Sequence, residues 1–485
     1  MPFHTAIKRF AADESGTMLV MWGLSFVVLF GIVALSFDLG RVGITRSELQ
    51  AYADNIALAA AGELDGKADA LIRAQSAAST LIADRKTFGT GDDTLSGAAD
   101  FALTYYSAVP DSDTSTLSAV TTDPAEARYV HADVIDSTVG ATFGAAFSTL
   151  TGNSGPNELA SAEAVAGFTQ YACDVTPLMF CIPPGFIADA NVGTMIRLRS
   201  GGNGAAWGPG DFGFLDPAKV EVDDEGPCAG LNGINMDACL LGAEGSITQC
   251  FDQRGVDIEP GQKVGIEDAV FNVRFDMYSA IMNSERNDPN FAPAPNVIKG
   301  IVPNGGGSCI GNNEEISPDT VGLPRDTCFG SGTCSRYGDG NWAVGRADYV
   351  NINYAGTDPH PLATTRYAYY LAEIAAAGGP GSATAILSDL SETGRPQCST
   401  HQSSDPKRRV IIAAGVDCVA TPISGAATDV PVKEFVEIFL TEPVGDDGTS
   451  PPNVDIWGEV IGSAGGGVGG TGDAGIFRDL VQLYR

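Results

Sequence analysis

The sequence predicts an α+β protein. An amino-terminal transmembrane helix continues into an amphipathic helix, a small α+β unit follows, and a loop-rich, disulfide-containing β-rich domain completes the chain. Three observations predict this fold class: residues 18–37 carry no charge, apolar residues at helical spacing continue beyond them, and all ten cysteines lie after residue 170 among glycine-rich turns. We expect a cytoplasmic tail over 1–15, the anchor and amphipathic helix over 16–66, an α+β domain over 67–170 and a cysteine-containing β-rich extracytoplasmic domain over 171–485.

The uncharged segment from Met18 to Phe37 is long enough to cross a membrane. At about 1.5 Å per residue, a helix of this length matches the hydrocarbon core of about 30 Å. A cleavable secretory signal is the alternative, but such signals have apolar cores of roughly 7–15 residues and a small-x-small cleavage site, for which Ser36-Phe37-Asp38 is a poor match. We therefore expect an uncleaved span that includes Met18, Trp22, Phe26, Phe30, Val33 and Phe37.

An apolar stripe at spacings of three and four follows the span, which indicates one face of a continuing helix. The stripe consists of Leu39, Val42, Leu49, Tyr52, Ala53, Ile56, Ala57, Ala60 and Leu64. The opposite face carries Arg41, Arg46, Glu48, Gln50, Asp54 and Asn55, so we expect that face to be wet. The stripe needs an apolar partner, which is either this chain's own domain or a neighbouring subunit.

The order of polar and small residues around this helix carries a family resemblance. The relevant residues are Lys8-Arg9, Gly16, Asp38-Leu39-Gly40-Arg41, Leu49-Gln50, Ala53-Asp54 and Ala57-Leu58-Ala59. In this order they resemble the amino-terminal module of TadG-like Flp pilus-assembly proteins, over roughly the first 60 residues. Less specific matches, among them Asp174-Val175-Thr176-Pro177-Leu178 and Gly338-Asp339-Gly340-Asn341-Trp342, extend the resemblance along the chain.

The resemblance implies a non-enzymatic envelope protein of the inner membrane that acts with Tad/Flp pilus-assembly proteins in pilus assembly, anchoring or adherence. In related pilin-like proteins, a glycine before the span is the peptidase site and a glutamate five residues later guides assembly. Here Gly16 is present, but Met21 stands at the glutamate position. This departure disfavours processing at Gly16 and favours the TadG-like class.

The net charge of −32 at pH 7 disfavours nucleic acid as a partner, because such a chain repels phosphate backbones and anionic headgroups. We interpret the acidity as a solvated surface rather than a dedicated ion site. The oligomeric state stays open at this point.

The cysteines indicate the compartment. They are Cys173, Cys181, Cys228, Cys239, Cys250, Cys309, Cys328, Cys334, Cys398 and Cys418, and none forms a Cys-x-x-Cys pair. The even count without metal-ligand spacing favours disulfides over zinc or free buried thiols. Disulfides require an oxidising compartment, so we expect the amino terminus in the cytoplasm and the large carboxyl-terminal part in the periplasm or outside the cell.

Local patterns predict the elements of the small α+β unit. Residues 67–85 have helical spacing, 129–134 and 162–168 have strand patterns, and Val139, Phe143, Phe147 and Leu150 lie on one predicted helix face.

In the β-rich domain, the spacing of Phe271, Phe275, Tyr278 and Met282 predicts a buried helical stripe. A helix is expected over 364–377 and an antiparallel meander over 410–416, 435–440 and 454–461. The glycine-rich residues 463–472 are expected to connect to a short final helix that contains Ile476, Leu480, Val481 and Leu483.

Motifs for hydrolase, metalloprotease and ATPase chemistry are missing from the sequence, so we expect no catalytic, cofactor or metal site. The nearest approach to a metal-dependent adhesion loop is Asp389-Leu390-Ser391-Glu392-Thr393, which lacks the surrounding α/β alternation. The rival to a pilus role is an extracytoplasmic adhesin or ligand-binding protein that shares only the membrane anchor.

Overall fold

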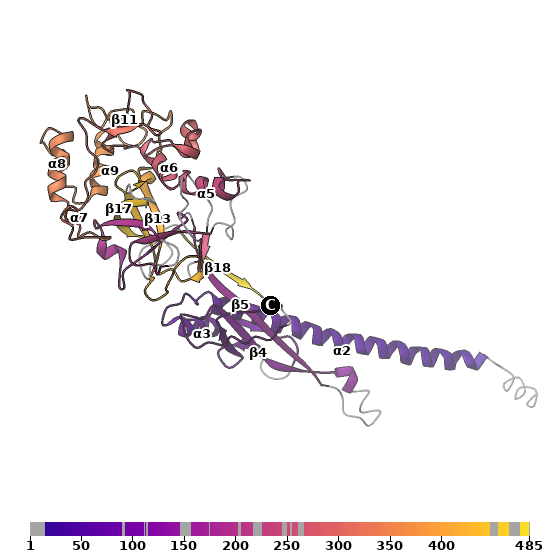
Figure 1. Ribbon diagram of the computed structural model, residues 1–485. Helices are drawn as coiled ribbons and strands as arrows, with labels where there is room; N and C mark the ends of the chain where they lie inside the picture. The colour runs from indigo at the N-terminus through magenta and orange to yellow at the C-terminus, as the bar shows by residue number, and fades with distance from the viewer. Residues whose placement is uncertain are drawn as a thin grey trace, which may run out of the picture. The chain divides into compact units, whose positions relative to one another are not determined.

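The computed structural model describes residues 15–89, 93–110, 112, 115–145, 157–173, 175–201, 205–216, 226–244, 250–252, 255–259, 266–446, 454–464 and 476–484. They fall into two compact units, Met1–Thr169 with Asp479–Arg485, and Gln170–Arg478. Figure 1 shows the elements of each unit. The fold is mixed α+β with a long apolar helix first and a disulfide-containing β-rich part after it, as the sequence predicts.

The first unit is built on the helix α2 (Ser15–Ala61), which runs without a break from the apolar segment through the amphipathic segment. Its second half packs against α3 (Ala70–Leu81) and against a sheet in the order β18-β5-β4-β3. The strands are β3 (Phe101–Tyr106), β4 (Tyr129–Gly140), β5 (Asn157–Cys173) and β18 (Phe477–Leu483), and a small hairpin of β1 (Ala83–Arg85) and β2 (Thr94–Ser96) completes the unit.

Three predictions for this region are wrong. The helix expected over 67–85 is confirmed only as α3, because residues 83–85 pair with β2 as the strand β1. The carboxyl-terminal residues form the strand β18 rather than a helix, because the edge of β5 offers backbone hydrogen bonds that outweigh a short local pattern. Of the residues predicted to share one helix face, Val139 belongs to β4, and Phe143 lies in a helical turn that the described residues show at 142–145. Phe147 and Leu150 of that predicted helix, residues 1–14 of the expected tail and residues 465–472 of the glycine-rich run lie outside the described residues.

The second unit contains a closed barrel of six strands. Their order around the barrel is β6 (Leu178–Cys181), β8 (Asp211–Leu215), β7 (Met195–Ser200), β17 (Val454–Ser463), β15 (Glu434–Leu440) and β13 (Val410–Val416), which pairs with β6 again. The β7–β8 and β13–β6 pairs are parallel and the other four are antiparallel. The predicted antiparallel meander of β13, β15 and β17 is therefore confirmed, and strands from residues 178–215 close it.

Alternate side chains of the barrel strands form one core. Phe180, Phe212 and Ile438 belong to this cluster together with Phe271 and Phe275, which come from outside the barrel strands. The four residues of the predicted aromatic stripe, Phe271, Phe275, Tyr278 and Met282, are each at most 2% exposed. They do not share one helix, however, because α6 (Glu267–Asn272) passes into a 3-10 turn at Val273–Phe275 that ends at Asp276 in the left-handed region.

Helices and short strands surround the barrel. Helix α9 (Arg366–Ala376) begins where predicted, after Thr365, whose hydroxyl accepts a hydrogen bond from the backbone N–H of Ala368. The remaining elements are α5 (Gly233–Gly242), α7 (Thr327–Gly330), α8 (Ala343–Asn353), β9 (Cys250–Asp252), β10 (Val256–Glu259), β11 (Ile301–Pro303), β12 (Glu314–Ile316), β14 (Ala427–Val430) and β16 (Gly445–Asp446).

All ten cysteines are paired in disulfides, as the sequence predicts. The pairs are Cys173–Cys250, Cys181–Cys418, Cys228–Cys239, Cys309–Cys398 and Cys328–Cys334. The second pair bridges 237 positions of the sequence and attaches β6 to the segment after β13. This bridge therefore reinforces the parallel contact that closes the barrel.

Candidate functional site: the amino-terminal helix

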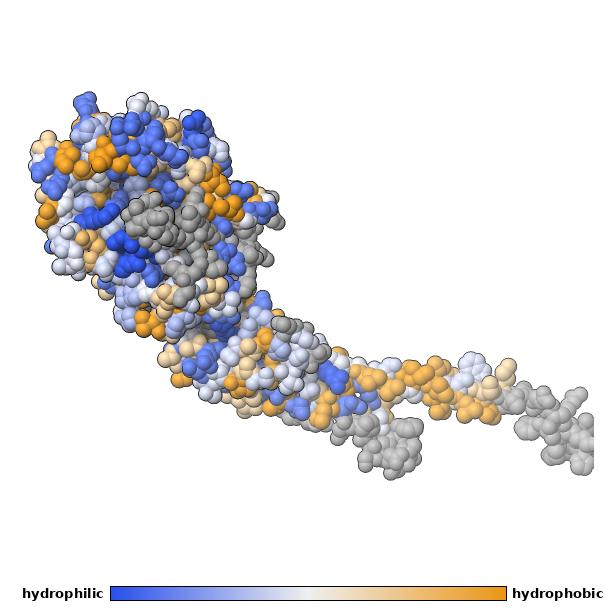
Figure 2. Space-filling model, in the orientation of Figure 1, coloured by the Kyte–Doolittle hydropathy of each residue, from blue (hydrophilic) through white to orange (hydrophobic). Residues whose placement is uncertain are grey.

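The first half of α2 is predominantly apolar, and no residue of its most apolar stretch is buried by the described part of the chain. The predicted span residues Met18, Trp22, Phe26, Phe30, Val33 and Phe37 are between 48% and 68% exposed. Figure 2 shows hydrophobic residues covering this part of the helix. Exposed apolar surface of this size needs an apolar environment, and the helix is long and apolar enough to cross a membrane.

The second half of α2 buries its apolar stripe within the first unit. Leu49, Ala53, Ile56, Ala57 and Ala60 are fully buried, and Val42 is 8% exposed. They share a cluster with α3 and with inward-facing residues of β4 and β5. Leu39 is 56% exposed and lies outside this contact. The alanines leave room for close approach of the helix to the sheet.

The polar face of α2 makes hydrogen bonds with the backbone of the same unit. Arg46 donates to the carbonyl oxygen of Leu159 at 3.4 Å, and Gln50 donates to that of Glu163 at 2.9 Å. The Glu48 carboxylate accepts from the Thr87 N–H at 2.7 Å. The sequence predicted a solvent-exposed face here. Helical periodicity alone could not reveal that β5 and the loop before β2 would supply hydrogen-bond partners.

A second set of contacts fastens the turn after β4 to the end of the apolar segment. The Asp38 carboxylate accepts hydrogen bonds from the backbone N–H groups of Phe143, at 3.2 Å, and Gly144, at 2.8 Å. Arg41 donates to the Gly140 carbonyl oxygen at 3.1 Å and also to the Thr142 hydroxyl. The rings of Phe37 and Phe143 meet edge to face, with centroids 5.3 Å apart.

This helix is the part of the chain that comparison with known proteins recognises. Residues 16–63 match the family model "Putative Flp pilus-assembly TadE/G-like". The TadE/G-like segment therefore takes in both the apolar half of α2 and the docked half, as the resemblance in the sequence indicated. Neither the curated proteins nor the solved structures contain a match to the chain.

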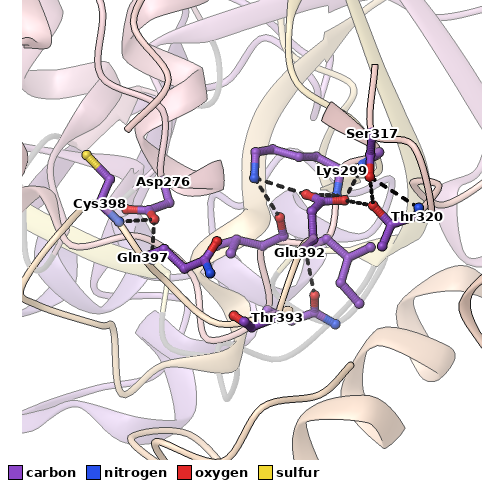
Figure 3. A network of polar contacts seen from close by, with 12 residues as sticks. Asp276, Lys299, Ser317, Thr320, Glu392, Thr393, Gln397 and Cys398 are labelled. Carbon is purple, nitrogen blue, oxygen red and sulfur yellow. Dashed lines mark hydrogen bonds and ion pairs between the residues drawn. The ribbon is translucent and has the colours of Figure 1, made fainter. Parts of the chain in front are cut away.

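In the second unit, the loop that resembled an adhesion motif has a structural role (Figure 3). The Glu392 side chain is 4% exposed and accepts hydrogen bonds from the Gly300 N–H at 2.7 Å and the Thr320 hydroxyl at 2.7 Å. Lys299 Nζ lies 3.1 Å from the same carboxylate. Ser391 donates its backbone N–H to the Asp319 carboxylate. The Glu392 carboxylate thus joins its own loop to the segments that contain Gly300 and Thr320, and it does not face an open site.

Beside α7, the carboxylate oxygens of Asp326 and Asp339 and the sulfur of Cys328, which are atoms of the kind that coordinate metals, lie within 4.8 Å of one another. The donor set does not suit a metal, because the Cys328 sulfur is bonded to Cys334 and cannot act as a thiolate. Asp326 already accepts from Arg366 and from the Gly340 N–H. These residues therefore fit a structural junction.

Buried carboxylates of the second unit are similarly engaged by protein donors. Glu373 accepts from the hydroxyls of Tyr349 and Tyr354 and from the Asn296 amide, at 2.6–2.7 Å. Asp276 accepts from the backbone N–H groups of residues 397–399 at 2.6–2.8 Å. Burial raises the pKa of both carboxyls above its ordinary value. Their acceptor positions are filled by structural donors, so they are not poised for proton transfer to a bound molecule.

A groove of about 920 Å³ lies beside β17 in the second unit. Trp457 lines this groove, and the Arg325 guanidinium lies 3.8 Å from its ring centroid. Asp348 and Glu442 add carboxylates to its walls. This mixture of aromatic and charged groups is suited to recognising a polar surface ligand.

Proposed function

We propose that this protein is a non-enzymatic, single-pass inner-membrane protein that acts in the assembly, anchoring or adherence of Flp pili. The observation that carries the proposal is the TadE/G-like helix, whose apolar half is bare and whose other half is docked. The span anchors the molecule in the lipid, and the docked half holds the first unit on the same rigid element. Tad pilus-assembly proteins are the proposed partners.

The proposed orientation places the amino terminus in the cytoplasm and both units in an oxidising compartment. Five disulfides support this orientation, because cytosolic thiols are kept reduced. We expect the cysteines of intact cells to resist a thiol-alkylating reagent until a reductant is added. Alkylation without reduction would place the second unit in the cytoplasm and contradict the orientation.

Gene deletion tests the pilus role directly. We expect deletion to abolish Flp pili on the cell surface and adherence, and a plasmid copy to restore both. Unchanged pili and adherence after deletion would reject the proposal, as would the failure of crosslinks from α2 of the intact protein to recover Tad components.

A matched pair of variants relates this role to the docked helix. Leu49→Asp places a carboxylate in the buried stripe, whereas Asn55→Asp places one on an exposed position of the same helix. We expect the first variant to fail to restore pili and the second to restore them. Equal restoration by both variants would show that the docked stripe is dispensable.

The groove beside Trp457 favours a second candidate function, which is ligand binding by an adhesin that uses the TadE/G-like helix only as its anchor. Asp348 is an exposed residue of the groove, and Asp268 of α6 is an exposed carboxylate outside its lining. If Asp348→Lys abolishes adherence while pili persist, and Asp268→Lys does not, the adhesin function is favoured. If both variants adhere normally, the groove is not an adhesive site.

A further inference from the structure

We propose that the turn after β4, residues 141–145, makes a second membrane contact, with Phe143 seated at the boundary between hydrocarbon and headgroups beside Phe37. The ligand of this surface is the phospholipid interface itself. The inference rests on the proposed membrane span of α2 and adds to it a lipid contact of the first unit.

The depth of Phe143 follows from the continuity of α2. Phe37 is the last residue of the uncharged segment, so a bilayer that covers 18–37 ends at its level. The Phe143 ring lies 5.3 Å from the Phe37 ring, centroid to centroid. Both residues belong to the first unit, in which α2 is a single helix. Phe143 therefore has the depth of the membrane boundary.

The exposure of Phe143 is exceptional for its residue type. Among the described residues, four phenylalanines count as exposed, namely Phe26, Phe30 and Phe37 of the span, and Phe143 at 45%. A phenyl ring in water forfeits roughly 1.5–3 kcal/mol that burial would supply. Aromatic rings are also favoured at membrane interfaces. Lipid contact accounts for the exposure of all four side chains together.

Polar contacts hold the ring at this position. Asp38 binds the N–H groups of Phe143 and Gly144, and Arg41, one turn further along α2, binds the Gly140 carbonyl oxygen. These bonds satisfy backbone groups that would otherwise meet the membrane surface unpaired. They also offset part of the free-energy cost of keeping the charged Asp38 carboxylate beside hydrocarbon.

The same geometry predicts a gradient of depth along the hairpin. Arg46 lies nine positions after Phe37, about 13 Å along the helix, and binds the Leu159 carbonyl oxygen. Headgroup regions extend only about 5–8 Å beyond the hydrocarbon on each side. Leu159, although 56% exposed, should therefore lie outside the hydrocarbon.

The experiment uses spin labels on single added cysteines in the full chain, reconstituted in phosphatidylcholine nanodiscs. The native cysteines are all in disulfides and leave the label site unique. Labels replace Phe30, Phe143, Leu159 and the control Val120, which is 61% exposed on the first unit. Accessibility to oxygen, which partitions into lipid, is compared with accessibility to a water-soluble nickel complex.

We expect the oxygen-to-nickel ratio to be highest at position 30, at least threefold above the control at 143, and within twofold of the control at 159. A ratio at 143 equal to the control, with position 30 in lipid, would overturn this inference alone. Equal ratios at 30 and 120 would overturn the membrane span and this inference with it.

Two further measurements separate apolar insertion from other causes. Asp38→Ala should reduce the ratio at 143 to the control value, whereas Asp54→Ala, which removes another carboxylate of α2, should leave it unchanged. An unchanged ratio in both variants would overturn the proposed fastening.

Because the net charge is −32, replacing a third of the lipid with phosphatidylglycerol should not raise the ratio at 143. A ratio that requires phosphatidylglycerol would overturn apolar insertion.

Discussion

Arg366 and Glu459 form an ion pair in which both side chains are fully buried, with Nη1 3.1 Å from Oε2. The other terminal nitrogen of Arg366 lies 2.5 Å from the Asp326 carboxylate, which is also fully buried. Through these contacts the start of α9 is joined to β17 and to the residue before α7. One guanidinium thus compensates two buried carboxylates.

Replacing Arg366 by methionine should destabilise the second unit strongly. The substitution leaves Asp326 and Glu459 buried without a counter-charge, and breaking such a pair costs about 3–5 kcal/mol of unfolding free energy. Urea unfolding of the full chain, followed by tryptophan fluorescence, measures this loss. The control is Arg325→Met, which breaks the partly exposed pair with Glu442 and should cost about 0–1 kcal/mol. Equal losses would contradict the structural role of Arg366.

Asp455 gives the protein a defined dependence on pH. Burial alone would raise the pKa of its carboxyl, but hydrogen bonds and charges from Arg199 and Arg197 outweigh this effect and lower the pKa below the ordinary value of 3.8. A carboxyl with a depressed pKa stabilises the fold above its unfolded-state pKa, and that contribution disappears as pH falls through the folded-state pKa.

The difference in unfolding free energy between the protein and Asp455→Asn should accordingly be constant from pH 7 to 5 and shrink below about pH 4. Guanidinium titrations at each pH provide the measurement. If this difference in unfolding free energy stays constant down to pH 2, the arginines do not stabilise the ionised Asp455 carboxylate in this way.

The Cys181–Cys418 disulfide should contribute more to stability than Cys328–Cys334. The first closes a separation of 237 residues and the second a separation of 6, and a cross-link that closes a longer loop restricts the unfolded chain more. We expect the double alanine variant of the first pair to lose about 2–4 kcal/mol and that of the second pair to lose less. Guanidinium unfolding compares them, and a reversed order would contradict the proposed reinforcement of barrel closure.

Local patterns in the sequence were sufficient to predict the helix α2 and the strands that pair in sequence order. The composition of the uncharged segment 18–37 predicts a long apolar helix, and the strands β13, β15 and β17, which have alternating or apolar patterns, pair in sequence order. The long helix, the meander and the oxidation of the cysteines could therefore be predicted, whereas the pairing of individual cysteines could not.

Long-range pairings could not be predicted in this way. Neither of the parallel contacts that close the barrel follows from local patterns: β13 and β6 lie far apart in the sequence, and β7 and β8 are consecutive strands that pair in parallel rather than as a hairpin. Nothing in any of these strands specifies its partner. Strand β18 shows the same limit, because its pattern suits a helix until the free edge of β5 is known. The fastening of Phe143 by Asp38 likewise joins residues 105 positions apart.

Tyr52 offers a test of the packing between α2 and the sheet. Its side chain is fully buried in the core of the first unit, and its hydroxyl has no hydrogen-bond partner within the described residues. A buried hydroxyl without a partner costs about 1–3 kcal/mol, so Tyr52→Phe should keep or raise stability, whereas Tyr52→Ala should cost about 3–5 kcal/mol through the cavity it leaves. Amide hydrogen exchange of α2 and β4 in the full chain measures both effects. Faster exchange in Tyr52→Phe would show that the hydroxyl makes a stabilising bond after all, and unchanged exchange in Tyr52→Ala would contradict the docking of α2 through this residue.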